Sequence, residues 1–180
     1  MTASGSVPPR LPLVDSPDDA LTREAFERLA ARRGILNLHR MMAHAPQLMK
    51  ASGDMAMVFR QEAMLPRSLA ELVVLRTAQV VSCDYVFARH LPLARAAGVT
   101  EQQIEEVARG PDSAAFTPAQ RAALSFAEKA AGGAPIEDGV FAALRSSYSP
   151  REIVELTMLV GFYVSTAIFI KALAVPDEKA

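Results

Sequence analysis

The chain has 180 residues, a formal net charge of -1 and a single cysteine. This length supplies one substantial core, so a single domain is the simplest expectation. Near-neutral charge without clustered Lys or Arg excludes the cationic surface that nucleic acids and acidic membranes attract, and one cysteine excludes an intrachain disulfide framework. We therefore expect a cytoplasmic protein with neither a nucleic-acid nor a membrane partner.

The predicted organisation is an extended N-terminal arm over residues 1–17, one helical domain over 18–175 and a short tail over 176–180. The arm contains several prolines and lacks the continuous apolar stretch of a signal peptide. Helix-start signals recur along the domain and strand patterns are nearly absent, which predicts an all-α fold of about eight helices. In chain order, the predicted helices cover 18–33, 46–63, 68–82, 83–97, 100–109, 117–132, 135–148 and the stretch after 149, and a short helical turn is predicted near 38–43.

Several of these helices begin at a capping box, in which a Ser or Thr is followed three residues later by Glu or Gln. The boxes are Ser68 with Glu71, Thr100 with Gln103, Thr117 with Gln120, and Ser149 with Glu152.

The last predicted helix carries the longest apolar run, Leu156–Ile170, between Glu155 and Lys171. This run is shorter than the roughly 20 residues that span a bilayer, so we expect a buried core helix. Because the run is apolar on every side, a small monomer would not cover it, and we expect a homo-oligomer.

The segment most indicative of chemistry extends from Glu71 to His90. If the chain reverses near Ser82 and the two helices pack antiparallel, Glu71 and His90 are offset by about 6 Å along the axes. The two side chains could then meet directly or through one water. A carboxylate that orients a histidine is an acid/base arrangement.

The second of these helices carries further candidates. Cys83, Val86, Phe87 and His90 share one helical face, and Tyr85 lies about a quarter turn away. Cys83 at a helix N-terminus would have its thiolate favoured by the backbone amides and the helix dipole. Because Val86 and Phe87 lie on the same helical face as His90, they are candidates to line a substrate pocket.

The order Glu71, Cys83 twelve residues later and His90 seven beyond it resembles the signature of alkylhydroperoxidase D (AhpD), in which a glutamate, a Cys-x-x-Cys pair and a histidine form the peroxidase site. Val86 occupies the position of that family's peroxide-attacking cysteine, and Cys83 matches the resolving one. A dithiol cycle within one chain therefore cannot form.

A wider resemblance to bacterial carboxymuconolactone-decarboxylase-like proteins rests on Arg33 to Leu48, Glu71 to Arg76, Tyr85 with His90, Leu91 to Gly98 and Glu152 to Tyr163. It implies an AhpD-like helical bundle, a ring-like oligomer, and acid/base chemistry on a lactone without a metal or organic cofactor.

Structural roles compete with these functional interpretations. Glu71 could serve only as the helix cap of Ser68, Cys83 could be a small buried apolar residue, and His90 could be an interhelical hydrogen-bonding residue. Arg76 could pair with an acid or contact an anionic substrate. His39 and His44 are not spaced to share a helix face, so no metal site is predicted.

Three functions remain open. The first is a cofactor-free carboxy-lyase-like or isomerising enzyme in which His90, oriented by Glu71, moves protons on a small carbonyl or lactone-type substrate, with Tyr85 as a hydrogen-bond donor. The second is a thiol peroxidase or redox sensor that uses Cys83 alone. The third is a non-catalytic helical oligomer that binds a partner or small ligand.

Overall fold

The computed structural model describes residues 8–31 and 34–178. Over these residues the secondary structure consists of nine α-helices without a strand, which confirms the predicted all-α fold. The helices are α1 (Ala20–Ala30), α2 (Asn37–Met42), α3 (Pro46–Gln61), α4 (Arg67–Val80), α5 (Asp84–Ala96), α6 (Glu101–Arg109), α7 (Pro118–Ala131), α8 (Asp138–Ser147) and α9 (Pro150–Leu173).

Local capping chemistry sets several helix starts as predicted. Thr100 accepts a hydrogen bond from the Gln103 backbone N–H at 3.2 Å, and the Gln103 side chain accepts one from the Thr100 N–H at 3.2 Å. Helix α7 begins with the same reciprocal pair. At the start of α9, Glu152 accepts the Ser149 N–H at 2.8 Å. These interactions satisfy backbone donors that the first helical turn leaves open.

Several helix boundaries differ from the prediction, most clearly at the starts of α1 and α8. Helix α1 is shorter at its start because Asp19 caps it, accepting the Thr22 N–H at 2.8 Å. Its predicted end falls on residues 32 and 33, which lie outside the described residues. Helix α8 begins at Asp138 rather than at Pro135, because Glu137 is an extended N-cap and the backbone before it is not helical.

The chain divides into two compact units, and the first comprises residues up to Val58 together with those from Phe169 onward. Phe26, Ala43 and Met49 are buried at its core. The Arg10 backbone N–H donates to the Leu173 carbonyl at 3.0 Å. This unit therefore joins the N-terminal helices to the segment that ends the chain.

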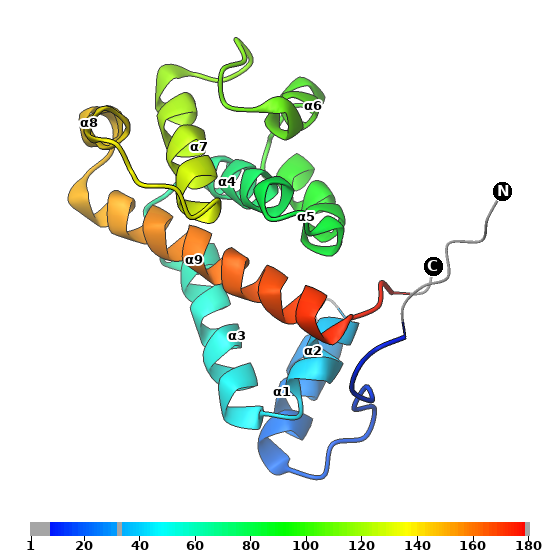
Figure 1. The fold of residues 1–180 in the computed structure, drawn as a ribbon. Helices are drawn as coiled ribbons and strands as arrows, with labels where there is room; N and C mark the ends of the chain where they lie inside the picture. Colours follow the sequence, from blue (N-terminus) through cyan, green and yellow to red (C-terminus); the bar gives the residue numbers. More distant parts are fainter. Residues whose placement is uncertain (1–7, 32–33, 179–180) are drawn as a thin grey trace, which may run out of the picture. The chain divides into compact units, whose positions relative to one another are not determined.

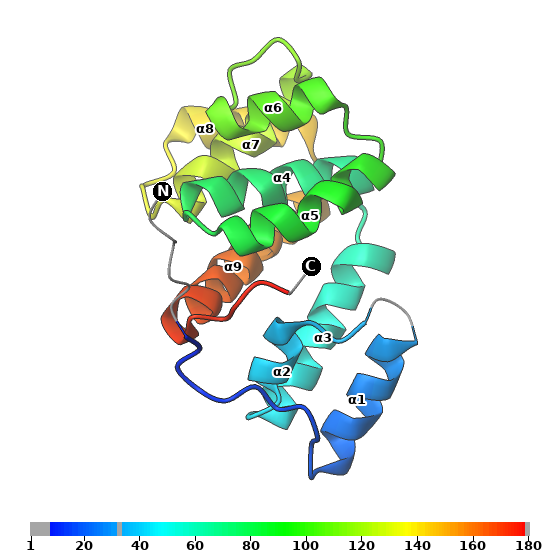
Figure 2. The same cartoon turned by 90° about the vertical axis from the view of Figure 1, so that its right-hand side faces the viewer.

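The second unit, Phe59–Ile168, is organised around α4. Helix α4 packs against α5, α6 and α7, and Figures 1 and 2 both show α5 alongside it. Every residue from Leu69 to Ala78 is buried. A helix enclosed in this way is apolar around its circumference, so its few polar side chains need partners inside the protein.

Helix α9 is only partly buried, which corrects the expectation of a buried core helix. Leu156 and Leu159 are buried, whereas Val154 is 62% exposed and Ile168 is 60% exposed. By length and composition alone α9 could cross a membrane, a property that core helices of soluble proteins share. An apolar exposed side is also what a subunit interface requires.

Candidate functional site

The turn between α4 and α5 positions the candidate residues. Ser82 has a φ of 51°, and its N–H donates to the Gln79 carbonyl at 3.0 Å. The Cys83 N–H donates to the Ala78 carbonyl at 2.9 Å. These two bonds form a Schellman closure of α4 with Ser82 in the left-handed position. Cys83 then serves at once as the N-cap of α5, so the chain reverses within two residues.

Glu71 on α4 and His90 on α5 meet directly across this reversal. His90 Nδ1 lies 2.7 Å from Glu71 Oε2. Glu71 is 1% exposed and His90 is 8% exposed. The predicted contact between the two side chains is therefore confirmed, without an intervening water.

The structure corrects the predicted capping box at Ser68. Helix α4 begins one residue earlier, at Arg67, and its N-cap Pro66 makes no side-chain cap bond. The Glu71 carboxylate instead accepts a hydrogen bond from Arg67 at Oε1 and one from His90 at Oε2. Glu71 is thus part of a side-chain network rather than a helix cap.

The sequence interpretation missed Arg67, although a signal for it was present. Arg67 precedes Glu71 by four residues, the spacing at which side chains on a helix are neighbours. The predicted capping box placed Arg67 before the helix. Outside a helix, residues four positions apart are not neighbours, so the pairing with Glu71 was not predicted. A helix that begins at Arg67 makes the ion pair a direct consequence of the sequence.

The network fixes which nitrogen of His90 can act on a ligand. A carboxylate paired with a guanidinium accepts hydrogen bonds, so Nδ1 of His90 carries the hydrogen that Glu71 binds. In the neutral ring, Nε2 then holds the lone pair. Within residues 8–31 and 34–178, Nε2 forms no hydrogen bond. His90 is consequently oriented by Glu71 at one nitrogen, and its other nitrogen makes no hydrogen bond to the described residues.

Aromatic rings adjoin His90 on the side of α9. The Tyr163 ring lies edge-on to the imidazole, with centroids 4.9 Å apart and planes at 88°. The ring centroids of Tyr163 and Phe162 lie 5.2 Å apart, and those of Phe162 and Phe59 lie 5.7 Å apart. This contact joins residues 73 positions apart in the chain, so no local sequence pattern identifies Tyr163 as a neighbour of the site.

The other predicted site residues on α5 are placed as follows. Cys83, Tyr85 and Val86 are buried, and Phe87 is partly buried. Cys83 lies seven residues from His90, which is about 10 Å along a helix axis. The thiol and the imidazole therefore occupy opposite ends of the same face and do not form an adjacent pair in the manner of Glu71 and His90.

Arg76, predicted as a substrate-pocket candidate, binds other helices. It donates to the Val107 and Ala108 carbonyls, each at 3.2 Å, and to Glu128 Oε2 at 2.5 Å. A guanidinium at the last carbonyls of α6 satisfies acceptors that the helix end leaves open. The structure thus gives Arg76 a role in joining α4, α6 and α7 and does not bring it to Glu71 and His90.

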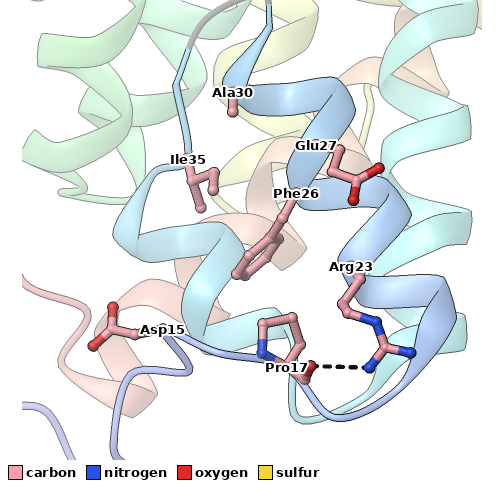
Figure 3. A pocket seen from close by; sticks show the side chains of 7 residues that line it. All are labelled: Asp15, Pro17, Arg23, Phe26, Glu27, Ala30 and Ile35. Carbon is pink, nitrogen blue, oxygen red and sulfur yellow. Dashed lines mark hydrogen bonds between the residues drawn. The ribbon is translucent and has the colours of Figure 1, made fainter.

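Two surface hollows lie apart from this pair. Figure 3 shows one of about 290 Å³ in the first unit, where Arg23 donates to the Pro17 carbonyl beside the Phe26 ring. The other, about 360 Å³ in the second unit, includes Arg76 and Glu128 in its wall. Neither is lined by Glu71 or His90.

Comparison with known proteins finds a family to which the middle of the chain is similar. Residues 46–129 match the model of the Carboxymuconolactone decarboxylase family. Over this region, which is slightly less than half of the chain, the protein is similar to that family. The matched region contains Arg67, Glu71, Cys83 and His90, so the whole candidate network lies within the segment that defines the family.

A curated relative and two solved structures agree with this assignment. The chain is 26% identical over 119 residues to the uncharacterized protein YdfG of Bacillus subtilis, covering 65% of this chain and 80% of that protein. The debrominase Bmp8, solved as a cysteine-to-alanine variant with 2,3,4-tribromopyrrole, gives a TM-score of 0.82 at 18% identity, covering 96% of this chain and 94% of that chain. An AhpD core, peroxidase-related protein from Ralstonia eutropha gives a TM-score of 0.78 at 18% identity, covering 94% of each. The two structures confirm the AhpD-like fold.

Proposed function

We propose that the protein is a cofactor-free acid/base enzyme that acts on a small carbonyl or lactone-type substrate, by decarboxylation or isomerisation. One observation carries this proposal: the buried Glu71 carboxylate binds Nδ1 of His90 and leaves Nε2 without a hydrogen bond to any described residue. A histidine oriented in this way is the usual means by which proteins transfer a proton near neutral pH.

In this reaction Nε2 of His90 removes a proton from the substrate, and Glu71 accepts the hydrogen bond of the imidazolium that forms. The same nitrogen then returns the proton to the carbon or oxygen that holds the negative charge, which completes an isomerisation. In a decarboxylation the bond to the substrate carboxylate breaks, CO2 leaves, the electron pair stays on the substrate as an enolate, and Nε2, protonated from solvent, gives a proton to that carbon. Tyr85, which is buried on the same helix, is the donor that the sequence suggests for the substrate carbonyl. The Tyr163 ring would bound the site with an apolar surface.

The proposal is tested by turnover of a panel of small lactones and β-keto acids. We expect His90→Gln to lower kcat by 10²- to 10⁴-fold, the usual contribution of a positioned general base. His44→Gln is the matched control, because His44 is an exposed histidine hydrogen-bonded to the Pro12 carbonyl. Turnover that survives His90→Gln at the level of this control would exclude His90 as the proton carrier.

A second candidate function is single-thiol chemistry at Cys83. It is favoured by the position of Cys83 as the N-cap of α5, at the positive end of the helix dipole, where its side chain makes no cap hydrogen bond. The structural likeness to a debrominase solved as a cysteine-to-alanine variant supports it also. Peroxide and halogenated pyrroles are therefore the substrates to assay, with an external thiol as reductant. Consumption that Cys83→Ser leaves unaltered would remove the thiol from the mechanism.

The remaining assignments are part of the same proposal. The exposed apolar side chains Val154, Met158 and Ile168 on α9 support a homo-oligomer. The single cysteine supports a reducing compartment, and we place the protein in the cytoplasm with a small-molecule substrate and no nucleic-acid or membrane partner. If neither His90 nor Cys83 variants alter any turnover, a non-catalytic ligand-binding oligomer is the function left.

A further inference from the structure

Three side chains form a continuous series at the site: Arg67, Glu71 and His90. Arg67 binds Oε1 of the carboxylate and His90 binds Oε2, so both oxygens of Glu71 are occupied by side chains. Glu71 is 1% exposed, whereas the Arg67 side chain is 35% exposed. The series therefore runs from a partly solvated cation through a buried anion to a buried imidazole.

Helix formation does not account for Arg67 at this position. Arg67 is the first residue of α4, where the helix dipole disfavours a positive charge. An arginine there is compensated by its pairing with Glu71, a carboxylate that could not remain ionised alone in the interior. The ion pair thus serves the buried carboxylate rather than the end of the helix.

The charge of the series depends on both Arg67 and His90. The net charge of Arg67, ionised Glu71 and neutral His90 together is zero. Without Arg67, the other two groups sum to -1, and a proton on His90 restores neutrality. Burial disfavours an uncompensated charge, so loss of Arg67 should convert the imidazole to imidazolium.

Other polar and aromatic groups lie near His90 on α5 and α9. Tyr163 of α9 presents its ring edge-on to the imidazole. On α5 itself, Arg89 is exposed, and Cys83 and Tyr85 are buried one to two helical turns away. Among these, Glu71 alone is in direct hydrogen-bond contact with the His90 ring, and Arg67 alone shares that carboxylate.

We infer that Arg67 is a positioning residue that keeps His90 as the neutral tautomer, with its hydrogen on Nδ1 and its lone pair on Nε2. The inference rests on the proposed function only for its catalytic meaning, since a base must be unprotonated to accept a proton. Removal of Arg67 should therefore change which ring nitrogens of His90 carry hydrogen, because the Glu71 carboxylate loses its other charged partner.

The experiment is ¹⁵N NMR of the full chain with labelled histidine at pH 7, since ring-nitrogen shifts distinguish the two neutral tautomers from imidazolium. The chain has three histidines, and His90→Gln identifies the signals of His90. In Arg67→Gln we expect Nε2 to acquire a hydrogen, whereas Arg67→Lys, which keeps the charge, should retain the wild-type tautomer. If Arg67→Gln does not fold, Arg67→Met keeps the apolar stem and removes the same charge.

Arg151→Gln is the matched control. Arg151 pairs with Glu155 at the same i,i+4 spacing near the start of α9, and Glu155 accepts backbone N–H groups rather than a histidine. This variant should leave the His90 signals unchanged. Wild-type His90 signals in a folded Arg67→Gln protein would overturn the inference, as would an equal shift in Arg151→Gln.

Turnover measured on the same variants separates this inference from the proposed function. If Arg67→Gln protonates His90 and turnover at pH 7 is unaffected, the proposed role of His90 as a base fails and the inference stands. If His90→Gln abolishes turnover and Arg67→Gln leaves the tautomer unchanged, the function stands and the inference fails.

Discussion

Truncation of Glu71 is the most informative test of the network's energetics. In Glu71→Ala, the His90 Nδ1–H loses its acceptor at 2.7 Å, and Arg67 loses its partner. Because Glu71 is 1% exposed, water does not readily replace the carboxylate. Breaking a buried ion pair in this way costs about 3–5 kcal/mol of unfolding free energy. Glu71→Gln keeps the shape and one acceptor oxygen, so it should cost about 1.5–3 kcal/mol.

Urea denaturation followed by far-ultraviolet circular dichroism measures both effects. Domains of this kind have about 5–15 kcal/mol of total stability, so Glu71→Ala should remove a large part of it. At about 2–4 °C per kcal/mol, its Tm should fall by roughly 6–20 °C. The Glu71→Gln/His90→Gln double variant should lose less than the sum of the two single variants, because the side chains share one interaction.

Glu101→Ala is the control for a surface pair. Glu101 accepts Arg95 at 2.7 Å and both side chains are exposed, so we expect no resolvable change in stability. A Glu71→Ala protein that unfolds at the same urea concentration as Glu101→Ala would refute the reasoning. The carboxylate would then have to be solvated, and the direct contact with His90 would have no energetic consequence.

Three further predictions concern other parts of the second unit. Ser82→Gly should stabilise the protein by about 0.5–1 kcal/mol in urea denaturation, because its φ of 51° strains a residue with a Cβ, whereas Ser82→Val should destabilise it. Burial and the Glu152 carboxylate raise the pKa of Tyr148 to about 12, so stability should be complete below pH 10 and fall by about 1 kcal/mol as the pH approaches 12. Tyr148→Phe should flatten that loss in denaturation curves at pH 9, 10 and 11. Met158→Glu places a charge on the exposed side of α9 and should reduce the mass found by light scattering toward that of one chain, whereas an unchanged mass would argue against an α9 interface.

The sequence predicted the local elements and the central pair well. The boxes at Thr100 and Thr117 involve groups three residues apart, so the first helical turn alone decides them. The meeting of Glu71 with His90 followed from counting along two antiparallel helices joined by a short reversal. The same kind of counting failed at Ser68. The local sequence fits a helix capped by Ser68 nearly as well as a helix that begins at Arg67, so it did not distinguish the two.

Other properties depended on packing between distant segments. The neighbourhood of Tyr163 and His90 joins α9 to α5, and no spacing within either helix specifies it. Arg76 could have faced a substrate or a protein acid, and only the position of α6 and Glu128 decided between them. The partial exposure of α9 was also undetermined, since an apolar run does not state how many of its sides other helices cover.

The sequence by itself therefore determined the all-α fold and brought Glu71 and His90 together, because short-range hydrogen bonds and helical periodicity fix these features. The structure was needed to fix the start of α4, and with it the local pairing of Arg67 with the second carboxylate oxygen of Glu71; only the packing of α9 gave His90 its aromatic neighbour. The physical reason is that an ionised carboxylate in the interior must be satisfied at both oxygens. Which groups satisfy it depends on the true start of α4 and on the helices packed around it.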